Sequence, residues 1–313
     1  MKKLAFFAGI LSATTSVLAL TLTVAPKANA ADIKAVDTVV IIDESGSMGG
    51  EQSWIQQVIP SLESAFKAAG FGSGADGNNY GLVGFGGGGS GNLGRTLTAN
   101  GNKLFGANDF ATAASNLVTS GGFEDGYSAI DYTFNNYNFR SSAVKNFILV
   151  TDEDRDNGNN ALTSQNILNR LKNSGTLLNA VVNATFRDGN GTTALGIDSK
   201  ANAYLADGSG GFTKSPGGTA VSGFGTTIPD YVDVALATSG AAWDLNQLRN
   251  GGDLAQSFTN GFIDIKVQEV VNTGGGNEEI PEPLTILGTL TAGAFGTQFM
   301  RKRKQMQAAK SEA

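Results

Sequence analysis

Residues 39–48, Val-Val-Ile-Ile-Asp-Glu-Ser-Gly-Ser-Met, join an apolar run to a short polar turn. The run is rich in β-branched residues, which predicts a strand buried on both faces of a parallel sheet. At its end stand Asp43, Ser45 and Ser47, in the spacing Asp-x-Ser-x-Ser. One carboxylate and two hydroxyls on a tight turn can converge on one cation, and Gly46 lets the backbone fold closely around it.

A second carboxylate follows another apolar run. Residues 147–150, Phe-Ile-Leu-Val, predict a second buried strand, and Thr151 and Asp152 come directly after it. Ligands of open α/β sheets bind at the carboxyl ends of strands, so we expect Asp152 to lie near the first turn. Oxygen ligands favour a hard cation, which predicts Mg²⁺, or else Mn²⁺ or Ca²⁺.

The composition agrees with an all-oxygen site, because the 313 residues include no His and no Cys. This excludes Ser-His-Asp and Cys-His triads, thiolate chemistry, disulfides and zinc sites built from His or Cys. The net charge of −6 also argues against nucleic acid as a partner, because nothing neutralises phosphate.

Predicted strands and helices alternate along the rest of the chain. Helices are expected over 51–69, 110–118, 125–134, 162–171 and 245–271, and strands over 36–42, 80–85, 147–150, 177–186 and 231–236. Residues 187–229 are rich in Gly, Thr and Ser without a clear period, which indicates an insertion or hairpin loop. The alternation predicts an α/β fold with a doubly wound, mostly parallel sheet flanked by helices, similar to a Rossmann fold.

The quoted turn resembles the metal-ion-dependent adhesion site of the von Willebrand factor type A family. Phe-Ile-Leu-Val-Thr-Asp at 147–152 and Leu-Ala-Thr-Ser-Gly-Ala at 236–241 are similar to further parts of that family's pattern. The resemblance covers about residues 34–272, within a domain expected at 31–272, and leaves 187–229 unmatched.

The resemblance also implies roles for the four oxygen-bearing residues. Ser45 and Ser47 would bind Mg²⁺ directly, and Asp43 and Asp152 would act through water. An open coordination position would then take the acidic group of a partner, either a protein or an acidic polysaccharide.

The third loop departs from the family pattern, which usually supplies a Thr after Gly-Gly. Counting back from Ala129 and Ile130 puts Glu124 at the Thr position, with Asp125 beside it. A third carboxylate would tighten metal binding but would leave less positive charge to attract a partner's acidic group. Glu124 can equally serve only to start a helix near its positive end, and both interpretations stay open.

Residues 152–158, Asp-Glu-Asp-Arg-Asp-Asn-Gly, resemble the start of a calcium-binding loop. The sixth position of such a loop requires Gly and the twelfth Glu, but this sequence has Asn and Thr there. We therefore expect a solvated acidic loop with Asp152 turned into the adhesion site. A weak second Ca²⁺ on Asp154 and Asp156 stays an alternative.

Residues 1–30 are similar to a secretory signal peptide. They combine Met-Lys-Lys, an apolar run over 4–24, and the small-residue ending Ala-Asn-Ala. Cleavage by signal peptidase is expected after Ala30, which would place the mature protein outside the cytoplasm.

The C-terminal region resembles the PEP-CTERM sorting signal of bacterial envelope proteins. After a linker at 273–280, residues 281–304 combine three features: the motif Pro281-Glu282-Pro283, an apolar stretch at 284–300 and a basic cluster at 301–304. The stretch has 17 residues, near the lower limit for a membrane-spanning helix. The resemblance implies a single transmembrane helix, followed by a short tail at 305–313. The helix would anchor the protein until an exosortase-type peptidase cuts the chain near the Pro-Glu-Pro motif. A plain tail anchor is the alternative.

The two terminal segments, 1–30 and 301–313, mask the net charge of the region between them, here called the body. They carry eight of the 22 basic residues and one of the 28 acidic residues. Residues 31–300 therefore contain 14 basic and 27 acidic residues and have a net charge of −13. Direct binding of this body to anionic surfaces is therefore not expected, except through a bound cation.

Together these patterns predict an exported, metal-dependent adhesion or ligand-binding protein of a bacterial cell envelope or extracellular matrix, and not an enzyme. A structural matrix protein with an unused metal site is the first alternative. A hydrolase using Asp43, Glu124 and Asp152 around a metal-bound water is the second, but no positioned base and no Gly-x-Ser-x-Gly support it.

Overall fold

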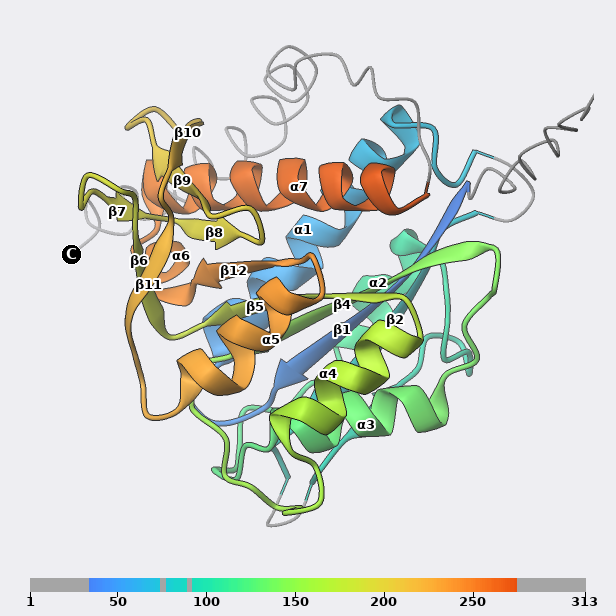
Figure 1. Cartoon of the computed structure of the whole chain (residues 1–313). Helices are drawn as coiled ribbons and strands as arrows, with labels where there is room; N and C mark the ends of the chain where they lie inside the picture. The colour runs from blue at the N-terminus through green and yellow to red at the C-terminus, as the bar shows by residue number, and fades with distance from the viewer. Residues whose placement is uncertain (1–33, 74–76, 89–91, 275–313) are drawn as a thin grey trace, which may run out of the picture. The chain divides into compact units, whose positions relative to one another are not determined.

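The structure, a computed structural model, describes residues 34–73, 77–88 and 92–274 (Figure 1). The predicted signal peptide at 1–30, the sorting segment at 281–304 and its membrane helix lie outside these residues and stay predictions. Within the described ranges, no helix combines the length and apolar character needed to cross a membrane.

A nine-stranded sheet runs through the centre of the fold, in the order β10-β9-β8-β12-β5-β4-β1-β2-β3 (Figure 1). The strands β2, β1, β4, β5 and β12 pair in parallel, and the other four pair antiparallel at the two sides. Their bounds are β1 Ala35–Asp43, β2 Asn79–Phe85, β3 Arg95–Leu97, β4 Ala143–Thr151, β5 Thr176–Val182, β8 Gly196–Asp198, β9 Asn202–Ala206, β10 Phe212–Pro216 and β12 Ala241–Asp244. The predicted mostly parallel α/β sheet is confirmed.

Helices cover both faces of this sheet because alternate residues of each central strand point to opposite sides. On β1, Val36, Val40 and Ile42 pack in the core under α1 and α7, whereas Val39 and Ile41 pack in the core under α3, α4 and α5. The helices are α1 Gly49–Ala68, α2 Phe110–Ala114, α3 Gly126–Asn136, α4 Ser164–Asn173, α5 Asp233–Ala237, α6 Leu245–Arg249 and α7 Gly252–Gly274, with short 3₁₀ and π turns at Ala107–Asp109 and Ile228–Val232.

An aromatic cluster holds α1 and α7 together over the sheet. The Trp54 ring lies 5.6 Å from Phe258 and 5.3 Å from Phe262, in edge-to-face geometry. Trp243, from β12, stands 5.7 Å and 5.6 Å from the same two Phe rings. Both tryptophans are buried core residues, and burial of each such side chain contributes about 1.5–3 kcal/mol.

The Gly-rich segment at 187–229, expected as an insertion or hairpin loop, is a run of short antiparallel strands. Its strands β8, β9 and β10 extend the central sheet beyond β12. The strands β7 (Thr193–Ala194) and β11 (Thr219–Gly223) pair with β6 (Ala184–Arg187) in a second sheet of order β11-β6-β7. Strands this short and exposed carry too few residues for an apolar alternation to be visible in the sequence.

Three other element predictions need correction. The strand expected at 231–236 is helical, in the π turn and in α5, because Tyr231, Val232, Val234 and Ala235 follow helical spacing and pack on the sheet. The strand expected at 177–186 is divided at Asn183 into β5 and β6, and the helix expected at 245–271 is divided at Asn250 and Gly251 into α6 and α7. Strand β12, which precedes α6, was not anticipated.

Candidate metal site

The turn after β1 and the end of β4 meet at the carboxyl edge of the sheet. These neighbouring parallel strands pair in register up to Ile42 and Val150, so Asp43 and Thr151 come next to each other. The Ser45 N–H donates to Asp43 Oδ1 at 2.7 Å, and the Thr151 hydroxyl donates to Asp43 Oδ2 at 2.9 Å. The Asp43 carboxylate is therefore fixed by both strands and fully buried.

The two serine hydroxyls of the turn point toward the second strand end. Ser45 Oγ lies 3.1 Å from Ser47 Oγ, and the Ser47 hydroxyl donates to Asp152 Oδ1 at 3.0 Å. The four residues Asp43, Ser45, Ser47 and Asp152, predicted from two separate stretches, thus form one connected cluster of oxygen atoms.

Glu124 borders the same cluster from the loop before α3. Gly86 lies close to both Glu124 and Asp43. A Cβ atom added to Gly86 would be 3.1 Å from Asp43 Oδ1 and 3.2 Å from Glu124 Cγ. Burial, followed by the nearby Asp43 charge, raises the pKa of Glu124 to about 8. Burial also raises the pKa of Asp43 to about 6. The site therefore gathers carboxylates with too little positive charge around them.

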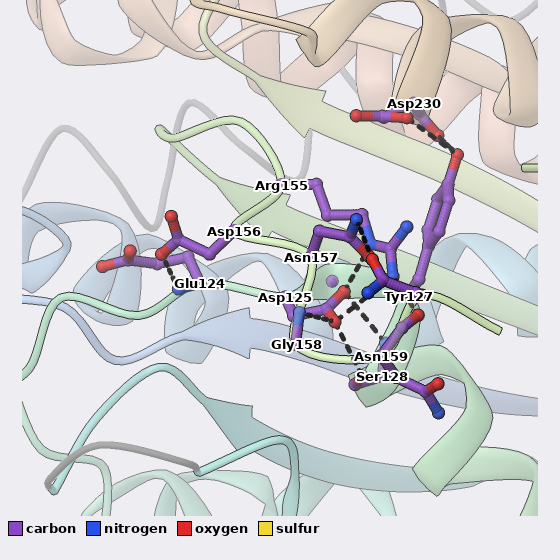
Figure 2. A network of polar contacts seen from close by, with 12 residues as sticks. Glu124, Asp125, Tyr127, Ser128, Arg155, Asp156, Asn157, Gly158, Asn159 and Asp230 are labelled. Atoms are coloured by element: carbon purple, nitrogen blue, oxygen red, sulfur yellow. Dashed lines mark hydrogen bonds and ion pairs between the residues drawn. The ribbon is translucent and has the colours of Figure 1, made fainter. Parts of the chain in front are cut away.

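Asp125 lies in a different environment from Glu124. Figure 2 shows its side chain directed toward Arg155, away from Glu124. Arg155 Nε donates to Asp125 Oδ1 at 2.7 Å, and the Ser128 hydroxyl and the Gly158 N–H donate to Asp125 Oδ2, each at 2.8 Å. Burial opposes ionisation of Asp125, but the hydrogen bonds from Arg155 and Ser128 outweigh it and lower its pKa. Both oxygens are engaged, so Asp125 does not extend the oxygen cluster.

The Asp125–Arg155 pair joins the two loops that carry the outer carboxylates. The Arg155 guanidinium stacks 4.5 Å above the Tyr127 ring, and the Tyr127 hydroxyl donates to the Asp230 carbonyl at 2.7 Å (Figure 2). One residue along, Glu124 N–H donates to Asp156 Oδ2 at 2.7 Å, and Asp156 N–H donates to the Glu124 carbonyl at 2.9 Å. The acidic loop 152–158 is thus tied to the backbone of Glu124.

Arg249, from α6, supplies a positive charge that the sequence patterns did not reveal. Its Nη2 donates to Asp152 Oδ2 at 2.8 Å and to the Ser47 carbonyl at 3.3 Å, and its Nε donates to Glu51 Oε1 at 2.7 Å. No motif marks this Arg, because it stands nearly 100 residues after Asp152 in a short helix. Only the tertiary fold, with α6 packed on α7 and Arg249 paired to Glu51 at the start of α1, brings it to the site.

Glu44, beside Asp43, faces the opposite side of the turn. Arg95 Nε donates to Glu44 Oε2 at 2.7 Å, and the Val118 N–H donates to Glu44 Oε1 at 2.9 Å. Glu44 therefore fixes β3 and the loop after α2, and it leaves Asp43 as the acid of the turn that faces the cluster.

The donors present suit a divalent cation bound by oxygen. Among the described residues no three His, Cys, Asp or Glu side chains are grouped closely enough to hold a metal by themselves. The candidate set is mixed instead: the hydroxyls of Ser45 and Ser47 with the carboxylates of Asp43 and Asp152, and with Glu124 at the border of the cluster. Hydroxyl and carboxylate oxygens are ligands of hard cations, and a bound cation would offset the raised pKa values of Asp43 and Glu124.

Residues 37–182 match the von Willebrand factor type A domain. The match extends over β1 to β5, the part of the fold that contains the oxygen cluster, and Arg249 lies outside it. The expected range of 34–272 is wider, because the match ends with β5, before β6 and the Gly-rich segment. Comparison with curated proteins gives no match.

Several solved structures are similar to this chain at low identity. BatB from Bacteroides thetaiotaomicron is 12% identical, over 77% of this chain and 99% of that one, with a TM-score of 0.43. The pilus adhesin SpaC from Lactobacillus rhamnosus GG is 18% identical, over 48% and 24% of the two chains, with a TM-score of 0.36.

The proximal thread matrix protein 1 of mussel byssus, solved with a zinc-occupied MIDAS motif, is 13% identical over 48% and 36% of the two chains, with a TM-score of 0.36. This chain thus spans about a third of the mussel protein and a quarter of the adhesin, and the activities of those whole proteins do not transfer with the resemblance.

Proposed function

We propose that this chain is an exported adhesion protein that binds its ligand through a divalent cation at the carboxyl edge of the sheet. The observation that carries the proposal is the convergence of Ser45, Ser47 and Asp152, whose side chains form a continuous chain of contacts of 3.1 Å and 3.0 Å. Asp43 and Glu124 complete the donor set. No enzyme activity is proposed.

The cation would be Mg²⁺, or Mn²⁺ or Ca²⁺, held by Ser45 and Ser47 with the carboxylates around them. When bound, it supplies a Lewis-acidic position for an anionic oxygen of the ligand. This chain's residues orient that position: Asp43 is fixed by β1 and β4, and Asp152 is fixed by Arg249.

The proposed ligand is an acidic group of a protein or of an acidic polysaccharide. Glu124 reduces the positive charge that such a group would meet, as the sequence suggests. Arg249 offsets this reduction, because its guanidinium lies at hydrogen-bond distance from Asp152 and is about a third exposed. The two residues act in opposite directions on the affinity for an anionic ligand.

The proposed location is the bacterial cell envelope or the surrounding matrix. Signal peptidase would remove residues 1–30 after Ala30, and an exosortase-type peptidase would act near Pro281, Glu282 and Pro283. Before that second cut the C-terminal helix would anchor the protein in the membrane, and afterwards the protein would be transferred or released. Measuring the intact mass of the envelope-associated protein tests both cleavages at once.

A structural matrix protein with an unused metal site is the second candidate. The observation that favours it is the Arg249–Asp152 ion pair, which already gives Asp152 a positively charged partner. In this case the fold would serve only as a stable module between other matrix components.

Thermal unfolding with and without Mg²⁺ tests the proposed function. A cation that binds only the folded state stabilises it by about 2.7 kcal/mol at 100 times its Kd. We expect a rise in Tm with Mg²⁺ that is lost in Ser45→Ala and kept in Ser53→Ala, a control on the exposed face of α1. A Tm that is independent of Mg²⁺, Mn²⁺ and Ca²⁺ supports the structural candidate, and hydrolysis that EDTA abolishes would support an enzyme instead.

A further inference from the structure

Two adjoining hollows lie at the edge of the sheet opposite the metal site, where the parallel strands begin. The first, of about 250 Å³, is bordered by the start of β5 and the turn before β12, and Lys172 from the end of α4. The second, of about 270 Å³, lies between the last turns of α7 and the strands β8 to β10. Ser239 and Thr273 border both, so the hollows form one continuous groove.

The second hollow is lined by polar and apolar surface in about equal parts. The Gly-rich segment contributes Lys200 and Lys214, and α7 contributes Asn272 and a single apolar side chain, Ile265. The lining thus supplies ammonium, amide and hydroxyl groups beside apolar surface from Ile265 and the Tyr204 ring. Such a lining favours a ligand that combines hydroxyl groups and negative charge with apolar C–H faces, as a sugar acid does.

Among the described residues, the lysines without a hydrogen bond or ion pair from their ammonium groups all lie at the groove. The described residues include eight lysines, and five of them have hydrogen bonds or ion pairs within the protein. The remaining three are Lys172, Lys200 and Lys214, and all three border these hollows. In a body with a net charge of −13, this is a local concentration of available positive charge.

Glu269 borders the second hollow and has an oxygen without a partner. Lys266 Nζ and Asn179 Nδ2 donate to its Oε2 at 2.7 Å and 2.8 Å, whereas its Oε1 is buried with no hydrogen bond. Glu269 is 9% exposed, and a buried unpaired oxygen costs free energy. Glu269 borders the hollow, so a rotation of its carboxylate would present this oxygen to a hydroxyl group of a ligand.

The other acids near the groove are already engaged. Asp198 accepts hydrogen bonds from the Lys200 and Asn202 backbone, from the Asn202 amide and from the Tyr204 hydroxyl. Asp264 accepts from the Gln268 amide at 2.7 Å. The Lys214 charge also acts on Asp264, but within the described part of the chain no hydrogen bond or ion pair holds the Lys214 ammonium, so it can turn to an external anion.

We propose that this groove is a second binding site, for a short segment of a uronic-acid polysaccharide. Lys172, Lys200 and Lys214 would bind its carboxylates, and Glu269 and Asn272 would accept and donate hydrogen bonds to its hydroxyls. The protein would then bind a polysaccharide at one edge of the sheet and a metal-bound ligand at the other, which lets one domain link two matrix components.

Titration calorimetry of the purified full-length chain with tetragalacturonate tests this proposal. EDTA is present throughout, so the measurement does not depend on the metal site. We expect binding that the triple variant Lys172→Gln/Lys200→Gln/Lys214→Gln weakens at least about tenfold, and that Asn272→Leu weakens about fivefold. All four residues border the groove at the surface, so their replacement leaves the core intact.

Three comparisons make the result decisive. The control triple Lys67→Gln/Lys103→Gln/Arg187→Gln removes the same charge from exposed positions elsewhere and should bind as the wild type does. Tetraglutamate, with equal charge but no hydroxyls, should bind more weakly than tetragalacturonate. No binding by the wild type, equal loss in both triples, or equal affinity for tetraglutamate overturns the proposal. Ser45→Ala should bind normally, which separates this site from the proposed metal function.

Discussion

Ser47 and Asp152 are 105 residues apart in sequence, yet the Ser47 hydroxyl donates to Asp152 Oδ1 at 3.0 Å. The contact forms because β1 and β4 are neighbours in the sheet and end at the same edge. It joins the turn that carries two hydroxyls to the loop that carries three further acids. Every prediction about the metal site depends on this junction.

The Glu124→Thr variant should bind Mg²⁺ at least about tenfold more weakly than the wild type, because carboxylate count tunes the affinity of such sites. The variant should also unfold at a higher temperature without metal, since it removes a buried carboxylate whose pKa is raised. Metal titration followed by Tm measures both effects. If metal affinity stays unchanged, Glu124 serves only to begin α3.

The Asp125→Asn variant should lower the free energy of unfolding by about 3 kcal/mol, because it leaves the buried Arg155 charge without its partner. The rise in Tm on adding Mg²⁺ should equal that of the wild type, since Asp125 faces Arg155. Asp131→Asn is the control: it breaks the partly exposed pair with Arg170 and should cost less than about 1 kcal/mol. Urea denaturation gives the free energies, and a lost Mg²⁺ response would make Asp125 a metal ligand after all.

The Arg249→Gln variant should bind Mg²⁺ several-fold more tightly than the wild type. Its guanidinium is 2.8 Å from Asp152 Oδ2 and repels a cation bound to the same carboxylate. Arg249→Lys keeps the charge and should leave metal affinity close to that of the wild type. If both variants change affinity equally, the effect comes from the geometry of α6 and not from charge.

The core of the metal site could be predicted from sequence because each part follows a long apolar strand. The strands that end at Asp43 and Thr151 are nine residues long and almost wholly buried, so their carboxyl ends could be placed at one edge without knowing the rest of the fold. Glu124 was placed by counting from Ala129, and the structure puts it at the same cluster.

The arginines that hold the site together could not be predicted. Arg155 and Arg249 reach their carboxylates through tertiary packing, and no local spacing indicates which acid each will pair with. For the same reason Asp125 could not be separated from Glu124, its neighbour in sequence. The helix at 233–237 was missed because Tyr-Val-Asp-Val-Ala-Leu has strand propensity, which burial against β5 overrides.

The Asp264→Asn variant should make stability less sensitive to pH. Burial raises the pKa of Asp264 to about 6, so the folded state holds this proton more tightly than the unfolded state does. The contribution of this proton to the free energy of unfolding is fully present below pH 3.8, the pKa of the unfolded state. It is lost as the pH rises through about 6, the pKa of the folded state. At pH 8 the variant should be more stable than the wild type by about 1 kcal/mol, allowing for partial solvent screening.

At pH 4 the Asp264→Asn variant and the wild type should have equal free energies of unfolding. Asp253→Asn, in the first turn of the same helix, should raise stability at neither pH, because an acid there favours the helix. An Asp264→Asn variant that is no more stable than the wild type at pH 8 would show that this carboxylate is ionised without cost.

A pair of glycine variants tests whether Asp43 and Glu124 converge. Gly86 and Gly88 have the same left-handed backbone, with φ of 78° and 75°. A Cβ at Gly88 meets nothing within 4 Å, whereas one at Gly86 meets Asp43 Oδ1 at 3.1 Å and Glu124 Cγ at 3.2 Å. Gly88→Ala should therefore cost only the backbone strain, about 1–2 kcal/mol.

Gly86→Ala should cost more than Gly88→Ala and should also weaken Mg²⁺ binding, because Asp43 or Glu124 must shift to accommodate the methyl group. Urea denaturation gives the difference in stability, and metal titration gives the difference in affinity. Since the two variants share the same strain, any difference between them reports on the surroundings of Gly86 alone. Equal stability and equal Mg²⁺ affinity would mean that the two carboxylates do not share one site.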